Sequence, residues 1–535
     1  MPALPIDLSD LPARHVSKVP SPIDGRTVVL LLALSAAAVL TNFAWQGTTG
    51  FNIADEGFLW YGSQGVVRGE VPQLDFMAYE PGRYYWTAAA MSLLHDDGIV
   101  ALRKALAALQ VVALTGALLI VASVQDKRVW STLLLCCVIF LLWMYPSHKL
   151  FDIAVSIALV ASVAWCIRKP MPARYFLLGA SVGAVTIVGR NHGLYGAIGS
   201  LIAIAYLAIR GVEVRWVRAF SLLAAGFASV ACAALAYASS VPGWLYAIRE
   251  SFLFVFEQGG TNLPLPIPWP WRAKFGAHFT LEELRQLLLG TVLLGLIAVP
   301  TAGYYWAMRQ PVEEIGIHSV ALASTFLALP YAHYAFSRAD LGHITLAAFP
   351  ALLLLLAMVF RLSRFGRLLA TSTLVVVSAV ILAPAQPGWQ AWRSGNWQQV
   401  AVARDTLLLE PGLGSVINLL RALADRYAPD DSVVLVTPYW PGAYPILSRK
   451  APVWEIYAVW PRGDRFQARE IERLDAAVPR LVVITDVALD GREELRFHNT
   501  HPLLDRYIRE NFEPVPGLVK PDYMYVYCSR NQAGF

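Results

Sequence analysis

The sequence predicts a polytopic α-helical membrane protein, with about eleven transmembrane helices and a soluble α/β domain at its C-terminus. Of the 535 residues, 56% are hydrophobic and 15% are charged, whereas soluble domains carry about 25% charged residues. Several apolar runs exceed the roughly 18 residues that a helix needs to cross a membrane. After Pro387, charged residues are spread throughout the chain. We therefore expect a transmembrane domain over residues 27–386 and an α/β domain over residues 387–535.

Eleven apolar runs are expected to span the membrane. They cover residues 27–45, 102–124, 129–145, 153–167, 175–189, 194–209, 219–240, 286–308, 316–336, 344–360 and 368–385. Basic clusters precede the first run and follow the second, fourth, sixth, eighth and tenth, so all of them lie on one side. Because basic loops stay in the cytoplasm, we expect a cytoplasmic N-terminal tail, residues 1–26. No small-residue cleavage site follows the first run, which is typical of a retained helix.

The opposite side carries the first outer loop, residues 46–100, and the whole C-terminal region. In that region, β-branched runs at 432–437 and 481–485 predict buried strands, and the stretches between them predict helices. The net charge of +5 reflects basic residues that set topology and gives no indication of nucleic-acid binding. None of the five cysteines forms a Cys-x-x-Cys pair, so neither a thiolate zinc site nor a disulfide framework is indicated.

The first outer loop is the strongest candidate for a functional site. It contains an unusual density of acidic residues, namely Asp55, Glu56, Glu70, Asp75 and Glu80, and aromatic residues are interleaved with them. Carboxylates beside a membrane span are costly unless they have a task or a partner. A carboxylate can take the proton of an acceptor hydroxyl during sugar transfer. The alternative interpretation is a solvated acidic loop beside the membrane.

Three motifs in this loop resemble those of the GT-C glycosyltransferases. They are Asp-Glu-Gly-x-x-x-Tyr at 55–61, Gly-x-x-Pro-x-x-Asp at 69–75 and Glu-Pro-x-x-Tyr-Tyr-Trp at 80–86. More narrowly, the chain resembles the branch of the protein O-mannosyltransferases and the aminoarabinose transferase of lipid A. The resemblance implies an enzyme of the bacterial inner membrane that moves a sugar from a polyprenyl-phosphate donor to a lipid, glycan or protein acceptor on the periplasmic face.

The resemblance also implies roles for single residues. Asp55, with Glu56 beside it, matches the acid that acts as general base. Glu80 matches an acid of a metal site, and Asp152 matches the second acid of the family. Glu56, Glu80 and Asp152 are together expected to shape the site or to bind a divalent cation. Arg83 stands in Glu-Pro-Gly-Arg where the aminoarabinose transferase has Glu-Lys-Pro-Pro, and is expected to replace the phosphate-binding lysine. For Asp152, a helix N-cap is the alternative.

Further cations on the outer side are candidate ligands of the donor phosphate. Arginine binds phosphate through its planar fork, and Arg190 and Arg338 are both expected on this side. His343 belongs to a polar cluster with His333 at the turn between the ninth and tenth spans. The alternatives are a snorkelling arginine at 190, an ion pair within the cluster, and a zinc site built from the two histidines.

Two other functions remain open. A transporter or flippase of lipid-linked saccharides would require charges in mid-span or an internal repeat, and neither is clear in the sequence. A membrane-anchored binding protein, with the C-terminal domain as its working part, would leave the Asp55 loop without a function.

Overall fold

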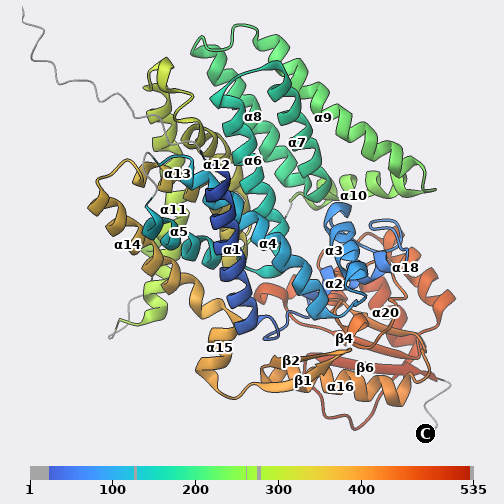
Figure 1. Ribbon diagram of the computed structural model, residues 1–535. Coiled ribbons are helices and arrows are strands. Elements are labelled where there is room, and N and C mark those ends of the chain that lie inside the picture. The colour runs from blue at the N-terminus through green and yellow to red at the C-terminus, as the bar shows by residue number, and fades with distance from the viewer. Residues whose placement is uncertain (1–22, 126–128, 261, 274–278, 531–535) are drawn as a thin grey trace, which may run out of the picture.

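The computed structural model describes residues 23–125, 129–260, 262–273 and 279–530. Most of the predicted N-terminal tail thus lies outside the described residues. A body of long helices fills the upper part of Figure 1. These helices are α1 (Gly25–Gln46), α4 (Ile99–Ala122), α5 (Trp130–Trp143), α6 (Leu150–Arg168), α7 (Pro172–Val188), α8 (Arg190–Ile209), α9 (Trp216–Ser239), α11 (Leu281–Met308), α12 (Ser319–Ser337), α13 (Leu341–Val359) and α14 (Arg364–Leu382).

Each of these helices coincides with one of the eleven predicted spans. Within the described ranges, eight helices are long and apolar enough to cross a membrane, and α5 and α7 are shorter apolar helices. The remaining helix, α12, has a lower hydropathy because it carries polar residues such as Ser324, Thr325 and His333. The predicted polytopic helical membrane protein is therefore confirmed.

Burial divides these helices into a centre and a rim. The most apolar stretch of α13 is 78% buried, whereas that of α9 is only 17% buried, and the exposed side chains of α9 include Phe227 and Leu235. Two glycines let α9 approach α7 closely. A Cβ at Gly179 would lie 1.9 Å from the Leu223 carbonyl oxygen, and one at Gly226 would lie 1.9 Å from that of Phe176. Small residues at such crossings allow helices to associate in a membrane.

The first outer loop folds into two short helices, α2 (Asp55–Val67) and α3 (Pro81–Leu93). The helix α2 begins where it does because the Asn52 side chain accepts the backbone N–H groups of Ala54 and Asp55, at 3.0 and 2.9 Å. The aromatic residues of the loop form its own core, in which Phe58, Trp60, Tyr61, Phe76 and Tyr84 are buried.

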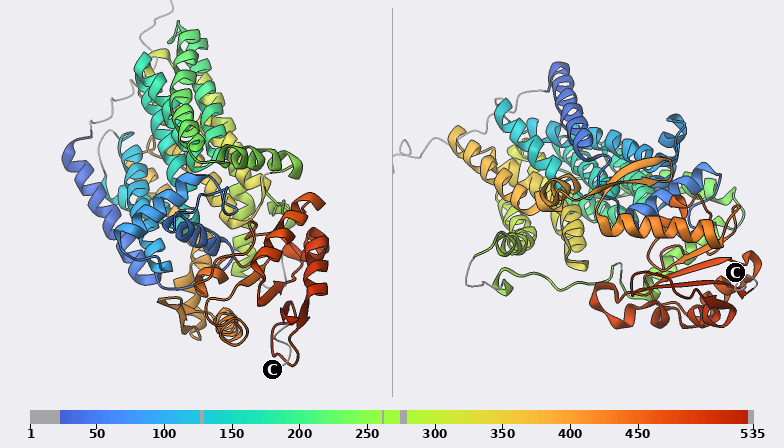
Figure 2. Two further views of the ribbon diagram at one scale, coloured as in Figure 1. Left: turned by 90° about the vertical axis from the view of Figure 1, so that its right-hand side faces the viewer. Right: turned by 90° about the horizontal axis from the view of Figure 1, so that it is seen from below.

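The C-terminal region lies at one end of the helical body (Figures 1 and 2). Its four-stranded sheet has the order β3 (Val434–Thr437), β4 (Leu481–Thr485), β6 (Met524–Ser529), β5 (Phe512–Pro514). The pair β3–β4 is parallel and the other two pairs are antiparallel. The predicted strands coincide with β3 and β4. A two-stranded sheet of β1 (Gln398–Val402) and β2 (Asp405–Leu409) was not predicted.

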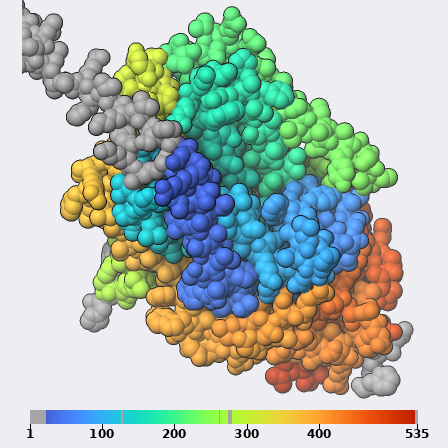
Figure 3. Space-filling view, in the orientation of Figure 1, coloured from blue at the N-terminus to red at the C-terminus, as the bar shows by residue number. Residues whose placement is uncertain are grey.

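The remaining helices are α10 (Trp244–Gln258), which packs against α9, and the helices of the C-terminal region. In chain order they are α10, which lies between α9 and α11, then α15 (Pro387–Ser394), α16 (Pro411–Tyr427), α17 (Ala443–Ile446), α18 (Asp464–Ala477), α19 (Phe497–Thr500) and α20 (Pro502–Asn511). The loop that follows α1 lies directly on the C-terminal region in the space-filling view (Figure 3). The β2 strand is part of this contact, since Gly50 donates a 2.8 Å hydrogen bond to the Leu408 carbonyl.

A glycine in the first motif accounts for the closest part of this contact. A Cβ at Gly57 would lie 2.5 Å from the Cα of Gly442, and the Gly442 N–H donates to the Ile53 carbonyl at 2.9 Å. Farther along, the Ala451 N–H donates to the Tyr61 hydroxyl at 3.1 Å. The segment after β3 is thereby packed against α2.

Gly57→Ala is therefore expected to destabilise the protein. Overpacking against backbone costs about 1–3 kcal/mol, which outweighs the gain of at most about 1 kcal/mol from the helix propensity of Ala. The measurement is denaturant unfolding in detergent. Gly463→Ala is the matched control, because no atom lies within 4 Å of a Cβ at that position. Equal stability of the two variants would contradict the assigned contact.

Candidate active site

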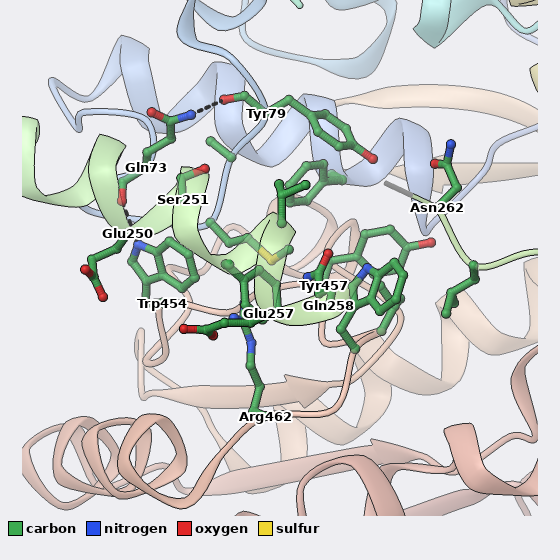
Figure 4. Close-up of a pocket in the computed structure, with 18 of the residues that line it drawn as sticks. Gln73, Tyr79, Glu250, Ser251, Glu257, Gln258, Asn262, Trp454, Tyr457 and Arg462 are labelled. Carbon is green, nitrogen blue, oxygen red and sulfur yellow. Dashed lines mark hydrogen bonds between the residues drawn. The ribbon is translucent and has the colours of Figure 1, made fainter. Parts of the chain in front are cut away.

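A cavity of about 1320 Å³ lies between the helical body, the first outer loop and the C-terminal region. It brings together seven of the eight predicted site residues from distant parts of the chain: Asp55, Glu80, Arg83, Asp152, Arg190, Arg338 and His343. Glu56 does not line this cavity. Figure 4 shows one side of the cavity, where α10 residues such as Glu250 and Ser251 face Trp454 and Tyr457 of the C-terminal region.

Arg462 ties α10 to the C-terminal region at this side of the cavity. Its guanidinium carbon lies 3.3 Å from the ring centroid of Phe254 and 4.2 Å from that of Phe466 in α18. Its Nε lies 2.6 Å from Glu455, whose other oxygen is 2.8 Å from His501 Nε2. Stacking on Phe254 therefore fixes α10 as a wall of the cavity.

Asp55 is the first residue of α2, and 32% of its side chain is exposed. The Tyr457 hydroxyl donates to Asp55 Oδ1 at 3.3 Å, and His148 Nε2 lies 3.8 Å from Oδ2. Of the four acids predicted as site residues, which are Asp55, Glu56, Glu80 and Asp152, only Asp55 has no arginine partner among the described residues. Burial favours the neutral acid, but the nearby Lys149 and His148 and the Tyr457 hydroxyl outweigh it and lower the pKa of Asp55. The carboxylate is therefore ionised at neutral pH and can accept a proton.

Glu56 points to another face of α2, because neighbouring residues on a helix do not share a face. Arg103 of α4 binds both of its oxygens, at 2.7 and 2.9 Å. The same guanidinium donates to the carbonyls of Gly47 and Gly50, at 3.0 and 2.7 Å. Burial would raise the pKa of Glu56, but the Arg103 charge outweighs it and holds the pKa below its usual value. This geometry favours a structural role for Glu56.

Asp152 and Arg83 belong to a buried network at the floor of the cavity. Arg83 Nη2 donates to Asp152 Oδ1 at 3.1 Å and to the Val188 carbonyl at the end of α7 at 2.8 Å. His192 Nε2 lies 2.8 Å from the same Asp152 oxygen, and its Nδ1 lies 2.9 Å from the Tyr331 hydroxyl. Asp152 forms no side-chain cap of α6. Asp152 thus contacts both Arg83, which the sequence analysis singled out, and His192, which it did not.

Arg190 and Glu80 form an ion pair at the edge of the cavity. Arg190 Nε lies 2.6 Å from Glu80 Oε1, and the two side chains are 25% and 14% exposed. Arg190 also donates to the Ser251 carbonyl at 3.1 Å and lies 5.3 Å from the Phe252 ring centroid. The pair thus joins α3, α8 and α10 while keeping part of the guanidinium accessible.

Arg338 and His343 are held by Asp340 at the turn between α12 and α13. Asp340 caps α13 by accepting the His343 N–H at 2.9 Å, and its carboxylate lies 2.8 Å from His343 Nδ1. Arg338 pairs with Asp340 at 2.7 Å and with both oxygens of Asp490 at 2.7 and 2.8 Å. The hydrogen bonds that Arg338 donates to the Asp490 carboxylate raise the pKa of Arg338 despite its burial. His333 does not line the cavity and pairs with Tyr195 instead, at 2.7 Å.

Lys149 is a cavity residue that the sequence analysis missed. It closes the short 3-10 turn Ser147–Lys149 before α6 and lines the cavity. Its charge acts on both Asp55 and Asp340. The side-chain ammonium of Lys149 makes no hydrogen bond or ion pair with any residue that the structure describes, whereas the guanidinium groups of Arg83, Arg190 and Arg338 are all paired. The signal that could have found it is its position in Pro-Ser-His-Lys, directly after an outer span end.

The predicted divalent cation does not fit these residues as they are placed. Within the described part of the chain, no three His, Cys, Asp or Glu side chains lie close enough to hold one ion. The carboxylates of Glu80, Asp152 and Asp340 are each bound by an arginine. The metal therefore stays a prediction of the resemblance, and no step is assigned to it.

Comparison with solved structures shows which fold this is. The chain is similar to ArnT from Cupriavidus metallidurans bound to undecaprenyl phosphate, with 14% identity, a TM-score of 0.52, and coverage of 94% of this chain and 98% of that chain. The structure of the same ArnT in the apo state shares 13% identity with this chain at a TM-score of 0.53, and the match covers 94% of this chain and 97% of that chain. The archaeal oligosaccharyltransferase AglB from Archaeoglobus fulgidus, in complex with an inhibitory peptide and a dolichol-phosphate, shares 13% identity at a TM-score of 0.49, with coverage of 94% and 74%.

No protein-family model and no curated protein matches the sequence. The similarity to ArnT nevertheless extends over nearly the full length of both chains. The chain therefore has the fold of the GT-C membrane glycosyltransferases, and the resemblance predicted from the motifs is confirmed at the level of the fold.

Proposed function

We propose that this protein is a membrane glycosyltransferase, which moves a sugar from a polyprenyl-phosphate donor to an acceptor hydroxyl with Asp55 as the general base. The observation that carries this proposal is the position of Asp55. Its carboxylate is ionised and faces a large cavity that Lys149 also lines, and neither side chain forms an ion pair with an arginine or a carboxylate, respectively, in the part of the chain that the structure describes. The likeness to ArnT with undecaprenyl phosphate bound supports a lipid-linked donor.

In the proposed reaction, the acceptor oxygen forms a bond to the anomeric carbon of the donor sugar. The bond between that carbon and the phosphate oxygen breaks, and its electron pair stays on the polyprenyl phosphate. Asp55 takes the hydroxyl proton, which makes the oxygen a better nucleophile. Lys149 stabilises the negative charge that grows on the phosphate, with the accessible part of Arg190 as a second ligand.

The other predicted site residues are proposed to build the walls of the site. Arg83 and Asp152 fix the end of α7, and Arg338 and His343 fix the turn before α13. The guanidinium groups of Arg83 and Arg338 and the imidazole of His343 already bind carboxylates of the protein. We therefore propose that these residues position the walls of the site and do not bind the donor phosphate. Glu80 orients Arg190, and Glu56 fixes the outer loop through Arg103.

We further propose a bacterial inner membrane location, with the cavity and the C-terminal region on the periplasmic face. The side is inferred from the basic clusters, all of which lie on the opposite side of the membrane. The acceptor is a lipid, a glycan or a protein that reaches the cavity from this face.

The function is tested by incubating the purified protein with a panel of radiolabelled polyprenyl-phosphate sugars and membrane acceptors. Transfer of label from at least one donor to an acceptor is expected. Absence of transfer from every donor, with protein that is folded by circular dichroism, would reject the proposal and favour a flippase.

Lys149→Gln is expected to weaken the binding of polyprenyl phosphate by roughly 10- to 100-fold, because a hydrogen bond to a charged group contributes about 1.5–3 kcal/mol. The dissociation constant is measured by isothermal titration calorimetry in detergent. Lys450→Gln is the matched control, since Lys450 is 64% exposed, pairs with Glu70 and does not line the cavity. If both variants bind like the wild type, the lipid phosphate does not lie at Lys149.

A further inference from the structure

His148 is a buried residue that takes no part in the reaction proposed above. It lies in the Ser147–Lys149 turn, and only 9% of its side chain is exposed. Its Nε2 is fully buried and has no hydrogen-bond partner among the described residues. Leaving a buried polar atom without a partner costs about 1–3 kcal/mol, so such an atom calls for an explanation. The nearest group of opposite charge is Asp55 Oδ2, at 3.8 Å.

A second cavity, of about 500 Å³, lies on the other side of this histidine. His148 lines the second cavity and not the first, whereas Asp55 lines the first and not the second. The two side chains therefore belong to the wall that separates the cavities. The walls of the second cavity are mixed, and the amide side chains of Asn42, Gln46 and Gln386 are among the polar groups that line it. A space of this size with such polar partners has room for water.

Of the carboxylates near His148, Asp55 interacts with the imidazole most directly. The charged groups that act on the imidazole are Asp55, Glu56, Lys149 and Asp152. Glu56 is neutralised by Arg103, and Asp152 is neutralised by Arg83. Asp55 is thus the carboxylate that remains free to attract a proton on His148, with Lys149 acting against it.

We propose that His148 receives the proton that Asp55 takes from the acceptor and passes it to water in the second cavity. This inference rests on the proposed function and extends it by one residue. In the step, the proton moves from the Asp55 carboxyl to His148 Nε2, while Nδ1–H releases a proton to water. No oxidation is involved, and the electron pair of the broken glycosidic bond stays on the polyprenyl phosphate.

This route returns Asp55 to its ionised form while the first cavity is still filled by the products. The 3.8 Å separation must shorten by about 1 Å to become a hydrogen bond. Catalytic hydrogen bonds are often long in the free enzyme and tighten in the complex with substrate. His148 is accordingly a positioning and proton-accepting residue that acts through Asp55 and does not touch the sugar.

His148→Gln tests the proposal, because glutamine keeps a similar size and polarity but cannot carry the proton. We expect kcat to fall roughly 10- to 100-fold, with the KM for the donor and the binding of polyprenyl phosphate unchanged. In an Asp55→Asn background the same substitution is expected to have no further effect, since the two residues act in series. His333→Gln is the control, because His333 lines neither cavity and binds Tyr195.

Chemical rescue separates proton transfer from a purely structural role. Imidazole fits the space left in His148→Ala, and adding it is expected to restore kcat, with substituted imidazoles ranking by their basicity. The proposal is overturned if His148→Gln keeps the wild-type kcat, or if neither variant responds to imidazole. If the wild type transfers sugar and only the His148 results disagree, the inference fails alone; if the wild type transfers no sugar, the proposed function has failed.

Discussion

Asp55→Asn is expected to lower kcat by roughly 100- to 10,000-fold, the range that a general base contributes. Asparagine preserves the size of the side chain but cannot take the hydroxyl proton. The fold should be retained, because the one hydrogen bond of the Asp55 carboxylate to a described residue is the 3.3 Å contact from Tyr457. The measurement is the rate of sugar transfer from a labelled polyprenyl-phosphate donor.

Asp75→Asn is the matched control for this substitution. Asp75 lies in the same outer loop and accepts the Val71 N–H at 2.7 Å, but it does not line the cavity. We expect this control to keep the wild-type rate within about 2-fold, as for a surface substitution away from a site. A wild-type rate in Asp55→Asn would remove Asp55 from the chemistry.

Arg103→Met is expected to cause the largest loss of stability, about 3–5 kcal/mol, which is the usual cost of removing one partner from a buried ion pair. The substitution leaves the Glu56 carboxylate buried without its counter-charge. It also removes the donors of the Gly47 and Gly50 carbonyls. The free energy of unfolding is measured by denaturant titration in detergent.

Two further variants isolate the ion pair. Arg404→Met removes an exposed pair with Asp97, and such surface pairs contribute only about 0–1 kcal/mol. The double variant Arg103→Met with Glu56→Gln should recover part of the loss, because the uncompensated charge is gone. A stability of Arg103→Met equal to that of Arg404→Met would show that the Glu56 pair does not hold the outer loop.

The helical part of the fold was predictable because its signals are local. A membrane span is a continuous apolar run, and each run ends at basic residues or at an outer polar turn. The same holds for β3 and β4, whose β-branched runs are buried from end to end. The hairpin β1–β2 was missed, since its residues mix polar and apolar types and its position depends on contacts with the distant Thr48 and Gly50.

The candidate site was predictable only in part. Asp55 and Glu56 carry the same sequence signal, yet one faces the cavity and the other binds Arg103, because the start of α2 sends them to different faces. The pairing of Arg83 with Asp152 and of Arg338 with Asp490 joins segments far apart in sequence. Lys149 and His148 lie in a short polar turn, and only the structure shows that this turn lies beside Asp55.

The most direct test of the central claim follows both products in proteoliposomes that contain the purified protein and a labelled polyprenyl-phosphate sugar. A glycosyltransferase releases one polyprenyl phosphate for each sugar that appears on an acceptor, and Asp55→Asn stops both. We predict this equal release for the wild-type protein. Movement of the intact donor across the vesicle membrane without release of polyprenyl phosphate would contradict the account and identify a flippase.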